Sequence, residues 1–481
     1  LSAGARPRFF ILMPTVDPRS TSDTRRKDPL THPREAWLLA DLFMGDQGKG
    51  TTVDYLARLR GAHTVVRFNG GAQAAHHVVG QDGQLHRFQQ FGSATLVPGV
   101  ATHLTRFMVL SPWNMLEEEE RLARLGVTDA FKRTTISENA LVITPWHEIA
   151  NRMRERARGV GRHGSCGAGV GETVKDSLEL DPSLIVRVRD LVGDAIALRE
   201  KFLRVQAYKL EQLRAEGVLA KCTHLRDAVH DIDDLFYPSV VDEYLCLLAP
   251  FLERARIVPD AYLGEILARP GTVIFEPAQG VLIDEWRGFH PYTTWSTCTL
   301  DNADALLEEH GYAGEVHRLG IVRAYGTRHG AGPFVTEDAG LSVRVPDAHN
   351  GQDGWQGVFR VGWFDAVAVR YAIACIGKLD GLIVTCLDRL KDEAEWKICT
   401  AYDTGRDIQL GPFKDLEYQE ALTRRLFEAV PRYGVSTRAS TQEERVAEHV
   451  AAIERELGLH VWITSHGPTA NDKRLTAHFG L

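Results

Sequence analysis

Short runs of apolar, β-prone residues recur between longer helical patterns, and this alternation constrains the fold more than any other feature of the chain. Helical patterns lie at 116–125, 195–216, 365–376 and 441–457, and the apolar runs lie at 36–44, 64–68, 107–110, 140–144, 272–275, 382–385 and 460–464. Several of these runs lack polar alternation, as strands buried on both faces do. We therefore predict a single α/β domain around a large, mainly parallel sheet flanked by helices.

Residues 14–35 are rich in Pro, Ser, Thr and charged residues and offer almost nothing to bury. Such a composition cannot offset the entropy that ordering would remove. We predict a disordered tail over residues 1–35 and one domain over 36–481. The five apolar residues at 9–13 are too few for a signal sequence or a membrane span, so we expect a cytoplasmic protein with no membrane partner.

Charge and cysteine content exclude two further classes of protein. The formal net charge is -8, and the basic residues are not gathered in one tract, which argues against a nucleic-acid polymer as partner. The seven cysteines form no CxxC pair, so neither a disulfide framework nor a zinc ribbon is indicated. Small anionic ligands that are held by local loops remain possible partners.

Polar, glycine-rich segments follow several of the predicted strands, at 45–50, 69–77, 276–280, 386–389 and 465–468. Ligands of open α/β sheets bind beyond the carboxyl ends of the strands, so we expect these segments to lie together. A further glycine-rich loop at 161–171 exposes many backbone amides, which suits a phosphate. Each segment alone also has a purely structural interpretation. The acidic run at 117–120 is interpreted as a solvated helix face, because consecutive helical residues point in different directions.

The segment GDQGKG at 45–50 is not a standard phosphate-binding P-loop. Phe43 stands where that motif requires its first glycine, and Gly50 stands where it requires Ser or Thr. An apolar run, three glycines, an acid, a lysine and a helix from about Thr51 predict a strand, a tight turn and a helix N-terminus. The acid, Asp46, has no role in an ordinary phosphate loop.

Six motifs, taken together and in order, resemble the adenylosuccinate synthetase family from about residue 36 to the end. They are GDQGKG at 45–50, RFNGGAQAAH at 67–76, FEPAQGVLID at 275–284, PYTT at 291–294, AYGTRHGAGPFVTE at 324–337 and VGWFDAVAVR at 361–370. The resemblance implies a P-loop-NTPase-like α/β fold with small subsidiary elements. It also implies a carbon–nitrogen ligase that joins L-aspartate to the 6-position of IMP at the expense of GTP, with Mg²⁺, in a homodimer.

The resemblance also assigns residues. Asp46 matches the general base that removes the proton from purine N1 and is also a magnesium ligand, together with the backbone at Ala75. The same comparison implies that Lys49 contacts phosphate, that His76 assists the leaving phosphate and that Gln279 holds the deprotonated purine. A carboxylate suits the role of general base. Removal of the N1 proton moves negative charge onto the 6-oxygen, which is otherwise a weak nucleophile. Substrate contacts are implied for Gln73, Ser165, Cys166, Gly167, Thr294 and Arg360, and contacts to the GTP for Gly48, Gly50, Asp388, Ser465 and Gly467. An acid at 388 can accept two guanine N–H donors.

Departures from the family pattern leave the substrates open. The phosphate loop reads Ser165 to Gly169 as SCGAG and lacks an arginine and a threonine of the family, and only Arg360 remains of an arginine run. Losing bidentate arginines weakens anion binding unless others, such as Arg323, Arg328 and Arg370, replace them. These changes resemble the divergent branch that includes phage 2-aminoadenylosuccinate synthetases, which act on dGMP.

Three functions therefore remain open from the sequence: the IMP-dependent ligase and two alternatives to it. That branch tends to carry serine in place of the catalytic aspartate, whereas Asp46 is retained here, which favours IMP. The first alternative is a (d)GMP-dependent enzyme that uses ATP or dATP. The second is a non-catalytic purine-nucleotide-binding protein, whose signature would be the loss of the acid or the histidine.

Overall fold

A ten-stranded sheet forms the centre of the protein in the computed structural model, which describes residues 33–161, 164–347 and 357–480. The first strand, β1 (Arg34–Asp41), lies between β11 (Glu315–Arg323) and β10 (Gly271–Glu276), and all three are parallel. On one side the sheet continues through β15 (Gly381–Thr385), β18 (Val461–Ser465) and the antiparallel edge strand β19 (Lys473–Leu475). On the other side it continues through β2 (Thr64–Arg67), β5 (Ala101–Leu104), β7 (Thr134–Ser137) and β9 (Arg256–Val258). The predicted large, mainly parallel sheet is confirmed.

Within the described residues, four small sheets accompany the large one. They are β3 (His76–Val79) with β4 (Leu85–Phe88), β6 (Val109–Leu110) with β8 (Leu141–Val142), β12 (Gly326–His329) with β13 (Phe359–Gly362), and β14 (Phe364–Asp365) with β16 (Trp396–Tyr402) and β17 (Pro431–Thr437). The apolar runs at 107–110 and 140–144 thus pair with each other and do not join the large sheet. Both runs are too short for their hydrophobic periodicity to show which sheet they join.

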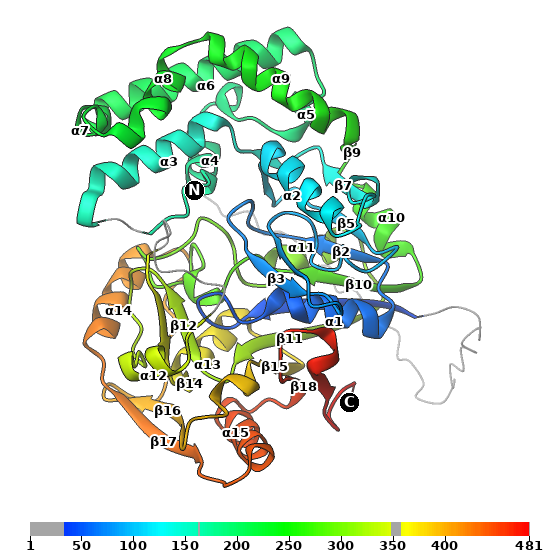
Figure 1. The fold of residues 1–481 in the computed structure, drawn as a ribbon, viewed down its shortest axis with the longest axis vertical. Helices are drawn as coiled ribbons and strands as arrows, with labels where there is room; N and C mark the ends of the chain where they lie inside the picture. The colour runs from blue at the N-terminus through cyan, green and yellow to red at the C-terminus, as the bar shows by residue number, and fades with distance from the viewer. Residues whose placement is uncertain (1–32, 162–163, 348–356, 481) are drawn as a thin grey trace, which may run out of the picture. The chain divides into compact units, whose positions relative to one another are not determined.

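Both faces of the large sheet are covered, which explains why its strands lack polar alternation. Leu38 and Ala40 of β1 point into one hydrophobic core, and Trp37 and Leu39 point into another on the opposite face. The first core is shared with α10 (Tyr262–Ala268), α11 (Asp301–Glu309), α13 (Ala366–Ile376) and α15 (Gln442–Leu457). The second is shared with α1 (Lys49–Arg60), which lies across the sheet in Figure 1.

A separate group of helices packs around a third core that also includes residues of β5 and β7. Its members are α2 (Pro112–Arg124), α3 (Pro145–Arg158), α5 (Val188–Leu191), α6 (Ala195–Ala215), α7 (Val218–Cys222), α8 (Val229–Phe236) and α9 (Ser239–Arg254) (Figure 1). The remaining helices are α4 (Val170–Glu179), α12 (Ala339–Arg344) and α14 (Leu416–Glu428). The four predicted helices correspond to α2, α6, α13 and α15.

One prediction about the surface is wrong. Glu118, in the acidic run at 117–120, is fully buried, and its two carboxylate oxygens accept hydrogen bonds from the backbone N–H groups of Gln89 and Gln90, each at 2.9 Å. The run therefore presents a mixed face, since Glu117 and Glu120 are exposed. A buried acid that satisfies backbone donors cannot be told from a solvated one by its neighbours in sequence.

The predicted tail at 1–35 lies almost entirely outside the described residues, and β1 already begins at Arg34. Among the residues that the structure describes, we find no single helix that is long and apolar enough to cross a membrane. The segments Arg226–Phe236 and Ser239–Arg254 satisfy length and composition only as a pair, and they meet at 91°.

Candidate active site

The loops that follow β1, β2, β10, β15 and β18 meet at the carboxyl edge of the sheet. The Thr385 hydroxyl donates to the carbonyl of Gln47 at 2.9 Å, and the Thr51 hydroxyl donates to the carbonyl of Pro468 at 2.8 Å. A Cβ atom added to Gly50 would lie 2.9 Å from Cβ of His76, so these two segments are in direct contact. The gathering expected from the sequence is confirmed by these contacts.

The GDQGKG loop encloses the carboxylate of Asp41, the last residue of β1. Asp41 accepts hydrogen bonds from the backbone N–H groups of Phe43 (3.1 Å), Gly45 (3.4 Å) and Gln47 (3.3 Å). The ammonium group of Lys49 lies 2.6 Å from Oδ2 of Asp41, and both side chains are buried. The loop thus surrounds an internal carboxylate with amide donors and a lysine, as a phosphate-binding loop surrounds phosphate.

Asp46 has a backbone conformation that non-glycine residues rarely adopt, with φ of 60°. Such strain persists where the surrounding structure imposes it, and it concentrates at functional sites. The Asp46 side chain is 28% exposed, and its Oδ2 lies 3.6 Å from Nε2 of His329 on β12. That distance is too long for a hydrogen bond, so this contact leaves the lone pairs of the carboxylate available to a ligand.

His76, at the start of β3, is held by a buried acid. Its Nδ1 lies 2.6 Å from Oε1 of Glu276, and its Nε2 lies 3.0 Å from the carbonyl of Ala278. Burial lowers the pKa of His76, although Glu276 opposes this effect. Burial alone would raise the pKa of Glu276, but the positive charge of Arg67 and the hydrogen bond to His76 lower it to about 2. Glu276 therefore stays ionised and fixes the orientation of the imidazole ring.

Several polar atoms around this edge are buried and have no hydrogen-bond partner among the residues that the structure describes. Both side-chain polar atoms of Gln73 and of Gln279 are in this state, as are Nδ1 of His329 and Nε of Arg360. Gly70 lies against Gln279, because an added Cβ would be 3.0 Å from its Oε1. Buried polar groups nearly always have hydrogen-bond partners, so a polar ligand is the expected partner of these amides.

Arg328, on β12, is 3% exposed and donates to carbonyls and a thioether: Ala331 O (2.9 Å), Pro333 O (3.3 Å) and Met44 Sδ (2.9 Å). Burial, together with the nearby charge of Arg360, lowers the pKa of Arg328 to about 9. A buried guanidinium bound to neutral acceptors favours an anionic ligand.

The other arginines considered from the sequence are bound to carboxylates. Arg360 pairs with Glu337 at 2.7 Å, and Arg323 lies 3.4 Å from Asp347. Arg370 is bound to Asp407 (2.7 Å) and to the carbonyl of Thr400 (2.9 Å), within the packing of α13 on β16. Of the three suggested replacements, Arg328 has the environment best suited to an anion.

The second glycine-rich loop packs against α3 and leads into α4. The amide of Asn151 donates to the Ser165 hydroxyl at 2.7 Å, and the N–H of Gly169 donates back to Asn151 at 3.3 Å. Burial raises the pKa of the Cys166 thiol, beside Gly167 in the same loop. An added Cβ at Gly171 would lie 2.9 Å from Trp295, which places the start of α4 beside the segment that carries Thr294.

Asp388, Ser465 and Gly467 lie in the loops after β15 and β18. The Ser465 hydroxyl donates to the carbonyl of Gly467 at 3.1 Å, and Asp388 is partly exposed. Lys473 joins this region to α1 through hydrogen bonds to the Thr51 hydroxyl (2.5 Å) and the carbonyl of Thr469 (2.7 Å). Burial lowers the pKa of Lys473 to about 8.

A cavity of about 620 Å³ is lined in part by Gly70, the residue that lies against the side-chain amide of Gln279. None of the residues predicted from the sequence lines it; its charged and aromatic lining includes Arg106, Phe107, Arg187, Arg189, Asp260, Glu285 and Trp295. Its size and its three arginines suit a small anionic ligand. All three arginines have partners, since Arg106 pairs with Glu309 at 2.6 Å, Arg187 donates to the carbonyl of Asn139 at 2.6 Å and Arg189 donates to Oδ1 of Asn139 at 2.5 Å.

Sequence reasoning missed Asp41, Glu276, His329 and Lys473. Asp41 had a recognisable signal, because it is an acid inside the apolar run at 36–44 that leads into a glycine-rich turn. Glu276 stood inside a quoted motif, and its role depends on His76, 200 residues away. His329 also stood inside a quoted motif, at 324–337, but its contact with Asp46 forms only in the folded chain. No local pattern identifies Lys473.

A metal site is implied at Asp46 and the backbone of Ala75. Carboxylate and carbonyl oxygens are the hard donors that Mg²⁺ prefers. Asp46 offers a partly exposed carboxylate beside the backbone amides of the GDQGKG loop, where phosphate oxygens would complete the coordination. The residues present therefore fit Mg²⁺.

These features together are those of a nucleotide-dependent α/β enzyme, with Asp46 and His76 at the carboxyl edge of its sheet. The family model described as adenylosuccinate synthetase matches residues 40–474. The adenylosuccinate synthetase of Psychromonas ingrahamii is 32% identical over 447 residues, which cover 89% of this chain and 95% of that protein. The Myxococcus xanthus adenylosuccinate synthetase is 34% identical over 383 residues, 77% of this chain and 82% of that one.

Two solved structures share the fold. The fully ligated adenylosuccinate synthetase of Plasmodium falciparum has a TM-score of 0.69 at 20% identity, covering 92% of this chain and 99% of that one. Cyanophage S-2L succinoaminodeoxyadenylate synthetase, bound to dGMP and dATP, has a TM-score of 0.59 at 16% identity, covering 92% and 96%.

The chain belongs to the adenylosuccinate synthetase family. It is a GTP-dependent carbon–nitrogen ligase of purine biosynthesis, and its family joins IMP and aspartate with GTP and typically uses Mg²⁺.

Proposed function

We propose that this enzyme condenses L-aspartate with the 6-oxo position of IMP through a 6-phosphoryl intermediate formed from GTP, with Asp46 as its general base. The proposal is supported by the contact of the Asp46-bearing GDQGKG loop with His76, and by the unpartnered amides of Gln73 and Gln279, which lie on the loops after β2 and β10. An amide that lacks protein partners can hold both a deprotonated ring nitrogen and its neighbouring oxygen.

In the first step Asp46 takes the proton from N1, and the charge moves to the 6-oxygen, which attacks the γ-phosphorus of GTP. Gln279 holds the purine anion, and Lys49 keeps a positive charge at the centre of the loop that faces the transferred phosphate. His76 is oriented by Glu276 through Nδ1, and its Nε2 exchanges the contact with the Ala278 carbonyl for a hydrogen bond to the bridging phosphate oxygen as GDP leaves. In the second step the amine of aspartate displaces phosphate from the activated carbon.

Magnesium, when bound at Asp46 and the Ala75 carbonyl, neutralises phosphate charge during transfer. We assign the IMP phosphate to Gln73, Thr294 and the loop of Ser165, Cys166 and Gly167. Arg360 and Arg328 are assigned to the anionic groups of the substrates. For GTP, Gly48 and Gly50 are assigned to the phosphates, and Asp388, Ser465 and Gly467 to the guanine base.

A (d)GMP-dependent 2-aminoadenylosuccinate synthetase that uses ATP or dATP is the second candidate. It is supported by the altered 164–169 loop, by the single retained arginine at 360, and by the shared fold of a phage enzyme whose structure holds dGMP and dATP. Asp46 supports the IMP assignment, because its carboxylate would crowd a 2-amino group. We further propose a cytoplasmic homodimer in which residues 36–481 form the single catalytic domain and 1–35 a dispensable tail.

The test measures phosphate release by the full chain. Each of IMP, dGMP and GMP is combined with each of GTP, ATP and dATP, with and without aspartate. The proposal expects the highest catalytic efficiency for IMP with GTP, and release that depends on aspartate. A preference for dGMP with ATP or dATP would replace it with the second candidate. Release that does not depend on aspartate would exclude aspartate as the amine donor.

A further inference from the structure

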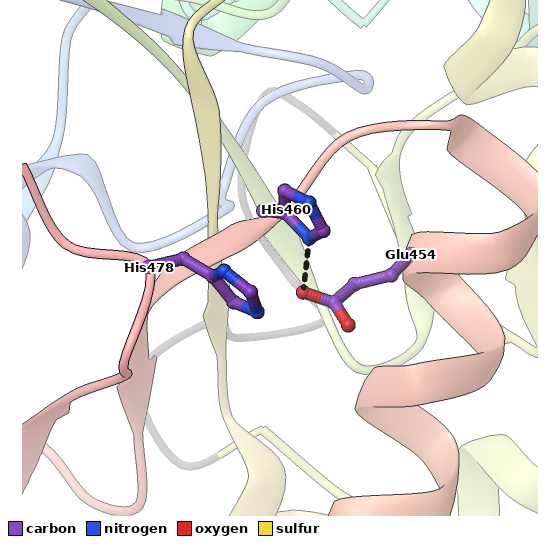
Figure 2. A group of neighbouring side chains, drawn as sticks. All are labelled: Glu454, His460 and His478. Atoms are coloured by element: carbon purple, nitrogen blue, oxygen red, sulfur yellow. Dashed lines mark ion pairs between the residues drawn. The ribbon is translucent and has the colours of Figure 1, made fainter. Parts of the chain in front are cut away.

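Two histidines and a glutamate meet on the surface at the amino end of β18, away from the candidate active site. Glu454 lies near the end of α15, His460 lies between α15 and β18, and His478 lies beyond β19; Figure 2 shows the three side chains directed toward one another. One potential ligand atom from each residue lies within 4.8 Å of those of the other two. Nδ1 of His460 is 3.6 Å from Oε1 of Glu454.

We propose that these three side chains bind a divalent transition-metal ion of the zinc class, and that the ion ties the C-terminal segment to α15. Imidazole and carboxylate groups together suit Zn²⁺, Co²⁺ and Ni²⁺, whereas Mg²⁺ prefers oxygen donors alone. The site is chemically distinct from the oxygen donors of Asp46 and Ala75.

Contacts that do not involve the ion hold the backbone of each ligand in place. The N–H of Val461 donates to Oε1 of Glu454 at 2.7 Å, which fixes the carboxylate beside His460. Thr476 anchors the segment that carries His478, since its N–H donates to the carbonyl of Trp462 at 3.0 Å and its hydroxyl to that of Val461 at 2.5 Å. These contacts position the segments that carry the ligands before an ion arrives, so binding requires rotation of the side chains but little ordering of the backbone.

The next aromatic residue strengthens this anchoring. Phe479 stacks on Trp37 of β1, with ring centroids 5.7 Å apart and planes 16° apart, and contacts Trp462 edge-on at 5.9 Å. The packing of Phe479 on Trp37 and Trp462 therefore also fixes the backbone position of its neighbour His478.

The rings must turn to bind an ion. The His460 and His478 rings stack with centroids 3.9 Å apart and planes 10° apart, so their nitrogen lone pairs, which lie in the ring planes, run side by side and do not converge. Bonds of about 2.0–2.2 Å to zinc require ligand atoms roughly 3.3 Å apart, which is closer than the present 4.8 Å limit. The His460 side chain is 66% exposed and can rotate about its Cβ–Cγ bond without disturbing the core.

The position of the site indicates what the ion would do. His460 precedes the first residue of β18, and Ser465 of the proposed guanine site is the last, so the strand separates the two sites by roughly 16 Å at 3.3 Å per residue. An ion at this distance does not touch the substrates. It stabilises the folded chain by binding it and not the unfolded chain, through the segment from Thr476 to Phe479.

The experiment uses the untagged full chain freed of metal by a chelator. Calorimetric titration with Zn²⁺ is expected to show one site, and Zn²⁺, Co²⁺ or Ni²⁺, but not Mg²⁺, is expected to raise Tm by a few degrees. Co²⁺ is expected to produce visible absorption bands of nitrogen coordination. His460→Ala and His478→Ala should each weaken binding at least about tenfold, the scale seen when metal sites lose supporting groups.

His224→Ala, which removes an exposed histidine outside the cluster, is the matched control and should leave binding unchanged. Should His478→Ala fail to fold, His460→Ala still decides, because its side chain is mostly exposed. Zn²⁺ binding that is absent, or that persists with equal affinity in the His460 variant, overturns the proposal.

Discussion

The ammonium group of Lys49 lies 2.6 Å from the carboxylate of Asp41, and both groups are buried at the centre of the GDQGKG loop. The backbone N–H groups of Gly45 and Gln47 in the loop, and of Phe43 before it, donate to the same carboxylate. The loop therefore has an internal anion in the position that a phosphate oxygen takes in phosphate-binding loops, and nucleotide phosphate must share or displace its donors.

Asp41→Asn should lower the free energy of unfolding by about 3–5 kcal/mol, because it leaves a buried lysine without its partner. Nucleoside triphosphate with magnesium should then raise Tm more in the variant than in the unmodified protein, since phosphate replaces the lost charge. Thermal unfolding with and without GTP measures both effects. Asp54→Asn, which breaks the pair with Arg58 on α1, is the control and should not increase the response to nucleotide. Equal responses in all three proteins would show that Asp41 does not compete with phosphate.

Asp46→Asn should reduce turnover roughly 100-fold or more, the usual scale for a positioned general base. Folding should be unaffected, because the side chain is partly exposed and its pairing with His329 is long. The measurement is kcat with IMP, GTP and aspartate, alongside Tm. Asp82→Asn, in the exposed turn between β3 and β4, serves as control. Near-normal turnover in a folded Asp46 variant would assign the base to another residue.

Asp46→Ser should narrow or reverse the preference for purines without a 2-amino group. A carboxylate that reaches N1 also approaches position 2, and a serine is smaller and can accept a hydrogen bond from the amine. Discrimination of this kind is on the order of 1–3 kcal/mol, or about tenfold to a few hundredfold. The ratio of kcat/KM for dIMP and dGMP in both proteins is the measurement. A preference for dGMP in the unmodified enzyme would refute the steric argument.

The free energy of unfolding should fall as the pH is lowered from about 6.5 toward 2. Protonation of Glu276 and His76 accounts for part of this fall. The pKa of Glu276 is lowered from 4.5 to about 2, so its contribution is present above 4.5 and is lost as pH falls to 2. That difference corresponds to about 3 kcal/mol. Burial also lowers the pKa of His76, so the unfolded chain takes up its proton first, below 6.5, and stability again falls with pH.

The free energy of unfolding, measured in urea between pH 2 and 7, tests this expectation. Glu276→Gln should be less stable at pH 7 and should lose less stability between pH 5 and 2 than the unmodified protein. Glu200→Gln, at an exposed position of α6, should follow the unmodified curve. Parallel curves for the Glu276 variant and the unmodified protein would mean that other carboxylates dominate.

A chain that starts at Pro33 should keep the Tm and activity of the full protein. It retains all of β1 and the carbonyl of Pro33, which accepts a hydrogen bond from Gly271 at 3.2 Å. Thermal unfolding and turnover of the shortened protein measure this directly. A marked fall in Tm would show that residues before Pro33 contribute to the folded domain.

The parallel sheet could be predicted because strands such as β1, β15 and β18 are buried on both faces, which removes polar residues from their sequences. The loops of the site followed from the same rule, since each comes directly after such a strand. By contrast, β11 was not recognised although it lies beside β1, because its first half, Glu-Val-His-Arg, is only partly buried and keeps polar residues.

The pairings inside the site could not be predicted from local pattern. His329 reaches Asp46 from β12, and Lys473 reaches Thr51 across 422 residues. Buried charge also escapes prediction: Glu118 and Asp41 read as ordinary acids in sequence, yet both are fully buried acceptors of backbone hydrogen bonds. Only tertiary packing determines which acids are removed from water.

The bond between the Thr51 hydroxyl and the Pro468 carbonyl has a consequence for how the enzyme is made. It joins residues 417 positions apart, so the segment that carries Asp46 leaves the ribosome long before its partner loop. Contacts of such long range form slowly, and strands waiting for distant neighbours expose unpaired edges. A nascent chain stopped before Pro468 would carry Asp46, His76 and Lys49 without this contact, so ligase activity should begin only after the loop at 465–468 has been synthesised.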